Sequence, residues 1–423
     1  MIHKKLDCGV TLVADALSCF RSATVGIWAQ AGSVTETAAD NGISHLIEHM
    51  LFKGTAKRSA KQIAVDVDRI GGQINAFTSK ENTCYYIKVM DEKLAEGIEI
   101  LTDLFCAPTL PPDELEREKG VVLEEIAMSN DQPDDVVMDL VAAHFFAGCS
   151  LERTILGPPD NIRRFTRSDL ENYMDRRYTA DNVVVAVAGN FDEHRLTEAL
   201  EKGLAGVRRG GRNPDYRALE ERTYAASASF QPKDIEQVQV CVALPCCSYS
   251  DRTARHALSV VSNVLGGSMS SRLFQSIREE RGLAYSVYSH PMLYRDTGMF
   301  TIYAGTMPQN TQQVTELIMQ ELRRMREHGI TPDELTQSKE MLKGSLILSL
   351  ESSSSRMSAL ARSMLAEGRP YTEEEMIAAI DAVDMEAVAR QIEETIDPDR
   401  VTGAYVGPVP NEQNLRSMLE RTA

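Results

Sequence analysis

Apolar and polar residues alternate along several short segments of the chain. Residues 23–28 and 238–244 alternate with the period of two that is typical of strands, and residues 183–189 form the continuous apolar run of a buried strand. Longer segments between them repeat their apolar residues every three or four positions, which predicts helices. We therefore expect an α+β fold in which each domain is a largely antiparallel sheet with helices packed on one face.

The same order of elements occurs twice, about 220 residues apart. Residues 112–115 and 332–335 both read Pro-Asp-Glu-Leu at the beginning of a helical segment. A loop and a helix follow each alternating strand, and a short strand ending in glycine closes each half, at 183–189 and 401–407. Three landmarks in the same order indicate the duplication of a domain of about 200 residues.

A cluster of glycine, proline and arginine at residues 208–214 has the composition of a linker. We predict an N-terminal domain at 1–208, a linker at 209–215 and a homologous C-terminal domain at 216–423.

The strongest candidate for chemistry is the H-x-x-E-H run at residues 45–49. His45 and His49 are four positions apart, so on a helix both imidazoles project from one face and can bind one metal ion. Glu48 lies beside the second histidine, where its carboxylate can activate a metal-bound water. Read in reverse, the run is the H-E-x-x-H helix of zinc proteases. The alternative is an amphipathic helix with two incidental histidines.

A catalytic zinc ion takes three protein ligands and keeps one position open, so a third ligand is needed. In the helix that opens with Pro112, two carboxylates, Glu118 and Glu125, share one face with apolar residues. Carboxylates in an apolar stripe are costly to bury unless a positive group pairs with them. We expect Glu125 to be the third ligand, Glu118 to orient a histidine or the water, and Glu124 to face solvent. The alternative is a solvated acidic helix.

The second copy of the domain lacks these groups. Counting 220 residues from Glu118 and Glu125 leads to Ser338 and Ser345, and the counterpart of the histidine helix is apolar. The metal chemistry is therefore expected in the first half alone.

Charge and cysteine usage narrow the class of protein. The 45 Lys and Arg residues against 62 Asp and Glu give a net charge of −17, which disfavours nucleic acid and anionic membranes as partners. The longest apolar stretch is too short to cross a bilayer, and the amino terminus lacks the apolar core of a signal peptide. Eight cysteines without regular spacing favour reduced thiols. We expect a cytoplasmic protein.

At this point the chain resembles the pitrilysin/insulinase family of zinc peptidases with an inverted motif. Residues 50–55, Met-Leu-Phe-Lys-Gly-Thr, are the usual continuation of the motif in that family, and Glu125 lies 76 residues beyond His49. The length of about 420 residues is similar to the bacterial branch, which is itself similar to the β-subunit of the mitochondrial processing peptidase. The match runs over nearly the whole chain.

The resemblance implies roles for particular residues. One zinc ion per chain would be held by His45, His49 and Glu125, with Glu48 as the general base. Residues 71–79 resemble a substrate-binding edge strand, which makes Asn75, Ala76, Phe77 and Thr78 candidate peptide contacts.

In the second half, Arg278 and Tyr285 match a pair that the family places across the cleft from the zinc. The resemblance gives them a role as hydrogen-bond donors to the developing oxyanion or to the substrate backbone.

Two functions follow from these features. The first is a zinc endopeptidase that acts on short or unfolded polypeptides in an enclosed chamber, completed by a homodimer. The second is a non-catalytic scaffold or partner subunit, like the core subunits of the respiratory cytochrome bc complex, which share the fold and typically lose part of the zinc set. The retention of the motif together with Glu118 and Glu125 favours the peptidase.

Overall fold

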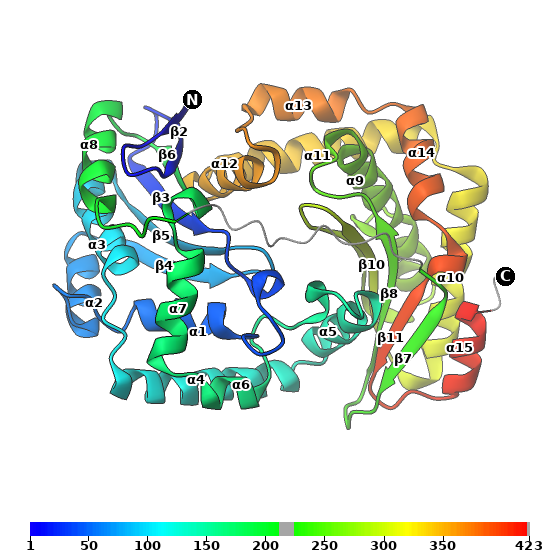
Figure 1. The fold of residues 1–423 in the computed structure, drawn as a ribbon. Coiled ribbons are helices and arrows are strands. Elements are labelled where there is room, and N and C mark those ends of the chain that lie inside the picture. Colours follow the sequence, from blue (N-terminus) through cyan, green and yellow to red (C-terminus); the bar gives the residue numbers. More distant parts are fainter. Residues whose placement is uncertain (211–223, 421–423) are drawn as a thin grey trace. The chain divides into compact units, whose positions relative to one another are not determined.

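The computed structural model describes residues 1–210 and 224–420, which form two compact units (Figure 1). Within the described residues, the first unit comprises 1–127, 153–210 and 348–372, and the second comprises 128–152, 224–347 and 373–420.

The first unit is built on a six-stranded sheet with the strand order β1-β2-β6-β3-β5-β4. All neighbouring strands are antiparallel except β2 and β6, which are parallel. The strands are β1 Ile2–Lys5, β2 Thr11–Ala16, β3 Ser22–Ala29, β4 Gln73–Thr78, β5 Thr83–Met90 and β6 Val183–Gly189. Because β4 lies at the end of the order, it is an edge strand.

Helices cover both faces of this sheet. On one face, Val25, Ile27 and Val185 belong to a core that includes α1 and α3. On the other face, Trp28 and Val184 pack against α12. The helices of this unit are α1 Ile43–Leu51, α2 Ala60–Arg69, α3 Leu94–Cys106, α4 Pro112–Asp131 (whose last residues belong to the second unit), α6 Pro159–Arg164, α7 Arg167–Arg177, α8 Glu193–Leu204 and α12 Ser353–Glu367.

The contact between α12 and the sheet is specific. Met357 lies over Gly26, where an added Cβ atom would be 2.5 Å from its sulfur, so the helix can approach the strand closely because residue 26 is glycine. The indole N–H of Trp28 donates to Met357 Sδ at 3.2 Å, and the hydroxyls of Thr24 and Ser353 are 2.9 Å apart. The helix is therefore an integral layer of the first unit.

The second unit repeats the plan with a five-stranded sheet in the order β7-β11-β8-β10-β9. Here β7 and β11 are the parallel pair, and the other neighbours are antiparallel. The strands are β7 Ser227–Gln231, β8 Val238–Cys246, β9 Ala284–Leu293, β10 Gly298–Thr306 and β11 Thr402–Val406. Its helices are α5 Pro133–Phe145, α9 Arg252–Gly266, α10 Thr311–His328, α11 Pro332–Leu350, α13 Glu373–Asp381, α14 Met385–Thr395 and α15 Glu412–Glu420.

The expected α+β fold with two similar, largely antiparallel sheets is confirmed, and the order of the second sheet matches that of the first without β1. The prediction that helices pack on one face is wrong for the first sheet, because helices cover both of its faces. The units are not contiguous in sequence, however, which differs from the predicted domains at 1–208 and 216–423. Each unit takes one helix from the other half of the chain: α12 covers the first sheet, and α5 packs on β8 and β11 of the second. Most of the predicted linker at 209–215 lies outside the described residues.

The burial of the strands explains why each unit includes a helix from the other half of the chain. Every residue of β6 is buried, and a strand that is apolar on both faces needs cover on both faces. One set of helices on one face would leave the other face in water.

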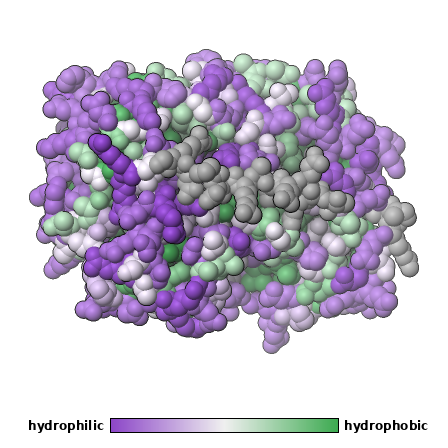
Figure 2. Space-filling view, in the orientation of Figure 1, coloured by the Kyte–Doolittle hydropathy of each residue, from purple (hydrophilic) through white to green (hydrophobic). Residues whose placement is uncertain are grey.

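On the face drawn in Figure 2, most of the visible side chains are hydrophilic. Within the described part of the chain, we find no helix with the length and apolar character needed to span a bilayer.

Candidate metal centre

Helix α1 carries the H-x-x-E-H run and is fixed by its buried face. Ile43, Leu46, Ile47 and Met50 are buried in the core of the first unit. Because apolar residues fill this face, the histidines are held on the side of the helix that turns toward α4.

The first turn of α1 is capped by a distant carboxylate. Its N-cap residue, Gly42, has φ +98° and no side chain that could accept a hydrogen bond. Instead, Glu36 Oε2 accepts from Gly42 N and Glu36 Oε1 accepts from Ser44 N, each at 2.9 Å, and Asn41 Nδ2 also donates to Glu36. Burial raises the pKa of Glu36, although the donors from Asn41 and Ser44 oppose the shift. Sequence reasoning missed Glu36, because it lies six residues before the cap outside any helix.

His45, His49 and Glu125 form a compact cluster of possible metal ligands. The imidazole centroids are 4.7 Å apart, and Glu125 Oε2 lies 3.5 Å from His45 Nε2 and 3.4 Å from His49 Nε2. One ligand atom from each residue falls within 4.8 Å of the others. The structure thus brings together the three residues that helical spacing selected.

Helix α4 presents Glu118 and Glu125 toward α1. Glu118 is 6% exposed, Glu125 is half-buried, and Glu124 is exposed as expected. Glu118 Oε2 lies 3.1 Å from His49 Nδ1, the ring nitrogen that faces away from Glu125. Its second oxygen, Oε1, accepts from Lys53 Nζ at 2.7 Å. Glu118 is therefore a partner of a candidate ligand and lies outside the ligand cluster itself.

The pKa values of the cluster respond to burial and to one another. Burial, together with the neighbouring His49, lowers the pKa of His45 to about 4. The negative charge of Glu125 acts in the opposite direction. The pKa of His49 is raised overall. Burial acts to lower it, but the hydrogen bonds to Glu125 and Glu118 have the larger effect. The hydrogen bond from His49 holds the pKa of Glu125 below its usual value.

Glu48 lies beside the cluster and contacts a different partner. Its Oε2 accepts a hydrogen bond of 2.5 Å from the hydroxyl of Thr78 at the end of β4. Burial raises the pKa of Glu48, while Thr78 and His49 oppose the shift. A carboxylate with a raised pKa is a better proton acceptor, which suits a general base.

The four candidate substrate contacts lie on the edge strand β4, but their side chains divide between its two faces. Asn75 and Phe77 are exposed, and the Phe77 ring packs edge-on against Trp28 at 5.3 Å. Asn75 Oδ1 accepts a hydrogen bond of 2.8 Å from the backbone N–H of Ala76. Thr78 faces α1, where its hydroxyl contacts Glu48.

Arg278 and Tyr285 lie in the second unit and contact each other. Arg278 is on a π-helical segment, Phe274–Glu279, and Tyr285 is on the edge strand β9. The guanidinium carbon of Arg278 lies 4.7 Å from the ring centre of Phe274 and 4.9 Å from that of Tyr285. Tyr285 is 77% exposed, which is unusual for a large aromatic side chain.

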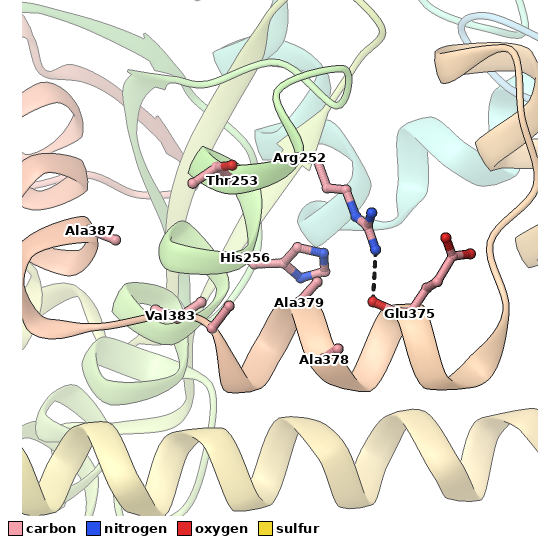
Figure 3. A pocket seen from close by; sticks show the side chains of 9 residues that line it. Arg252, Thr253, His256, Glu375, Ala378, Ala379, Val383 and Ala387 are labelled. Atoms are coloured by element: carbon pink, nitrogen blue, oxygen red, sulfur yellow. Dashed lines mark hydrogen bonds between the residues drawn. The ribbon is translucent and has the colours of Figure 1, made fainter.

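The second unit also has a surface hollow of about 380 Å³ (Figure 3). Arg252 and His256 project from α9 on one side, and Ala378 and Ala379 of α13 line the other. Arg252 Nη2 donates to the backbone carbonyl of Glu375 at 2.7 Å. Among the described residues, the His45 cluster is the group with the donor set of a metal site, and the hollow does not contain one.

Comparison with known proteins agrees with the presence of the candidate metal ligands in the first half of the chain. Residues 15–159 match the model of the insulinase family, peptidase family M16, and residues 164–342 match the model described as the peptidase M16 inactive domain. The second match covers most of the half in which the counterparts of Glu118 and Glu125 are serine and the counterpart of the histidine helix is apolar.

Relatives match along nearly their whole length. The chain is 43% identical to an uncharacterized zinc protease, YmxG, of Bacillus subtilis, over 92% of the chain and 95% of the relative. It is 37% identical to an uncharacterized zinc protease of Streptomyces coelicolor, over 96% of the chain and 90% of the relative.

Solved structures share the fold. A protease from Helicobacter pylori superposes with a TM-score of 0.90 at 23% identity, covering 96% of this chain and 99% of that one. A chain of complex III from Candida albicans superposes with a TM-score of 0.84 at 18% identity, covering 99% of both. The fold thus occurs in a protease and in a chain of complex III, and at these identities the likeness shows the fold alone. The two family models and the full-length relatives identify the chain as a member of the insulinase family of peptidases, peptidase family M16.

Proposed function

We propose that this protein is a zinc-dependent endopeptidase that hydrolyses short or unfolded polypeptides. The observation that carries the proposal is the cluster of His45, His49 and Glu125, whose ligand atoms lie within 4.8 Å of one another, with Glu48 beside it. Membership of a peptidase family supports the reaction class, and the local geometry supports the residue roles.

The cluster fits a catalytic zinc ion. Two imidazole nitrogens and one carboxylate oxygen are a known three-ligand set for such an ion, which leaves a fourth position for water or substrate. Glu118 supplies the outer partner that a ligating histidine usually has, because it contacts His49 Nδ1. One zinc ion per chain would be held by His45, His49 and Glu125. A zinc ion at this position supplies Lewis acidity toward the water and the scissile carbonyl.

Glu48 then transfers the proton of the attacking water. Glu48 accepts a proton from the attacking water as the new carbon–oxygen bond forms. It delivers that proton to the amide nitrogen as the carbon–nitrogen bond breaks. Thr78 holds Glu48 during both transfers, because its hydroxyl donates to Oε2 and leaves Oε1 for the water.

The edge strand β4 explains why an extended substrate is favoured. An edge strand presents unpaired backbone N–H and C=O groups, to which a peptide can add as a further strand. Ala76 N donates to the side chain of Asn75, so a peptide that pairs with this N–H group would displace that contact. Backbone pairing tolerates many side chains but requires an unfolded segment.

We propose from the family resemblance that Arg278 and Tyr285 donate hydrogen bonds to the bound peptide or to the developing oxyanion. The exposure of the Tyr285 side chain supports this role, because it leaves the hydroxyl accessible to a ligand.

We further propose that the protein works in the cytoplasm as a homodimer that encloses the substrate, without a nucleic acid or membrane partner. The eight cysteines are free thiols, which supports a reducing compartment. Sedimentation of the purified protein measures the assembly directly.

A peptide-cleavage assay tests the proposed reaction. The purified protein should cleave a quenched fluorescent peptide, lose that activity when a chelator removes the metal, and regain it when zinc is added back. A folded, zinc-loaded protein that leaves an unbiased peptide mixture intact would instead support the scaffold function.

The hydrogen bond between Thr78 and Glu48 gives a sharper prediction. Thr78→Val keeps the shape of the side chain but removes the hydroxyl, and we expect kcat to fall about 10–100-fold with KM and zinc content nearly unchanged. Thr78→Ser keeps the hydroxyl and should retain most activity.

Combining Thr78→Val with Glu48→Gln shows whether the two residues act together. If Thr78 acts through Glu48, the double variant should be no slower than Glu48→Gln alone. Additive losses would mean that Thr78 acts in some other way.

A further inference from the structure

We propose that Lys53 is a positioning residue of the metal centre. Its ammonium group fixes the carboxylate of Glu118, which in turn holds His49 with Nε2 directed toward Glu125 and the metal. The inference rests on the proposed zinc site and adds a residue to it that lies outside the ligand set.

The contacts form a short chain of charge-assisted hydrogen bonds. Lys53 Nζ lies 2.7 Å from Glu118 Oε1, and Glu118 Oε2 lies 3.1 Å from His49 Nδ1. The Glu118 side chain is 7% exposed, and that of Lys53 is 26% exposed. The bond to Lys53 is therefore largely shielded from water, where such bonds are stronger than at the surface.

This chain of contacts selects one form of His49. An ionised carboxylate can only accept hydrogen bonds, so the proton of the neutral imidazole must lie on Nδ1. Nε2 is then the nitrogen with the free lone pair, and it points at Glu125 Oε2, 3.4 Å away. A metal ion needs that lone pair, so the arrangement prepares His49 for ligation.

Lys53 is needed because Glu118 is buried. A buried carboxylate with one hydrogen bond retains an oxygen without a partner, which is costly and leaves the group free to rotate. Lys53 supplies the second contact and fixes the rotation. The two residues that hold the carboxylate, His49 and Lys53, are four positions apart at the end of α1.

The backbone keeps Lys53 close to that helix. Lys53 N donates to Met50 O at 3.1 Å, and Phe52 N donates to His49 O at 3.3 Å, so the chain makes one further turn beyond Leu51. The ammonium group and the imidazole therefore approach Glu118 from the same rigid element.

His45 provides a contrast within the cluster. Its Nδ1 is buried and has no hydrogen-bond partner among residues 1–210 and 224–420, so no carboxylate holds that side of its ring as Glu118 holds His49. The effect of Lys53 should therefore be confined to His49.

Substitution of Lys53 by methionine removes the charge and keeps most of the stem. We expect zinc affinity, measured by competition with a chelator, to fall up to about 10-fold, less than the usual cost of losing a direct partner of a metal ligand, because Lys53 acts through Glu118. At saturating zinc, kcat and KM should change much less. Lys53→Arg should recover much of the affinity, because a guanidinium can also donate to Glu118. Lys57→Met is the matched control, since Lys57 is exposed in the same loop.

A second readout separates positioning from general stability. In the metal-free protein, NMR should show a protected His49 Nδ1 proton in the native chain and in Lys57→Met, and its loss in Lys53→Met, with similar unfolding midpoints. If Lys53→Met keeps both the zinc affinity and the Nδ1 signal of Lys57→Met, the inference is wrong. It is also wrong if Lys53→Met weakens zinc binding only as far as it lowers the unfolding midpoint.

The outcome for Lys53 is separable from the proposed function. If the native protein binds no zinc, the proposed function fails, whereas the Nδ1 signal of the metal-free variants still tests whether Lys53 orients His49. If the native protein binds zinc and cleaves peptides but the Lys53 variants match the control, this inference alone fails.

Discussion

Replacing Glu48 with glutamine should leave zinc bound and reduce peptide cleavage about 10²–10⁴-fold. The amide has the size of the carboxylate, and its oxygen can still accept the hydroxyl of Thr78, so the local structure should persist. What the amide lacks is basicity, because it cannot take up the proton of the attacking water. Steady-state kinetics and the metal content of the same preparation measure the two effects separately.

Two results would contradict the prediction for Glu48. Substantial remaining turnover at full zinc occupancy would remove Glu48 from the role of general base. A loss of zinc together with activity would instead indicate that Glu48 supports the metal, which the geometry does not predict because Glu48 is directed at Thr78.

Replacing Glu125 with glutamine should remove both zinc and activity. The side chain places one oxygen within 3.5 Å of both histidines, and a neutral amide is a far weaker partner for a divalent cation. The loss of affinity should exceed the factor of about 10–100 that follows the loss of an outer partner such as Glu118.

Helix α4 offers a matched control for this substitution. Glu124→Gln makes the same chemical change one residue away, on the exposed side of the helix, and should bind zinc normally. If Glu125→Gln keeps zinc and activity, Glu125 is not the third ligand, and Glu118 and Glu124 become the residues to test.

Much of the fold could be predicted because the local periodicity and the duplication can both be recognised in the amino-acid sequence. The alternating residues 23–28 and 238–244 lie in β3 and β8, and the apolar run 183–189 is β6. The two Pro-Asp-Glu-Leu segments open α4 and α11, the long helices after which the chain passes into the other unit.

The exchange of α5 and α12 could not be predicted in the same way. Thr24 and Ser353 are 329 residues apart, and local patterns carry no information about such a contact. The burial of β6 on both faces was the available signal, but it did not identify the covering helix. A fragment of residues 1–210 lacks α12 and would leave Trp28 without Met357, so cutting the chain at the linker is a poor way to test the halves.

The cluster of possible metal ligands could be predicted from the sequence because helical spacing fixes which side chains share a face. That spacing selected His45 and His49 on α1 and Glu118 and Glu125 on α4, and the need of a zinc ion for a third ligand linked the two helices. The family resemblance supplied Arg278 and Tyr285, which have no distinguishing local pattern.

Three supporting residues depend on tertiary contacts and were not assigned their contacts from the sequence. Glu36 caps α1 from outside the helix, Thr78 reaches Glu48 from the edge strand, and Lys53 holds Glu118. Each is an ordinary polar residue in its local context, so these contacts become visible only when the elements are packed.

Anomalous diffraction from crystals of the zinc-loaded protein tests the central claim most directly. Data collected above and below the zinc absorption edge should give one strong difference peak per chain, within bonding distance of His45 Nε2, His49 Nε2 and a carboxylate oxygen of Glu125. A peak at other residues, or a native protein that shows no peak after loading, would contradict the assignment of this cluster as the zinc site.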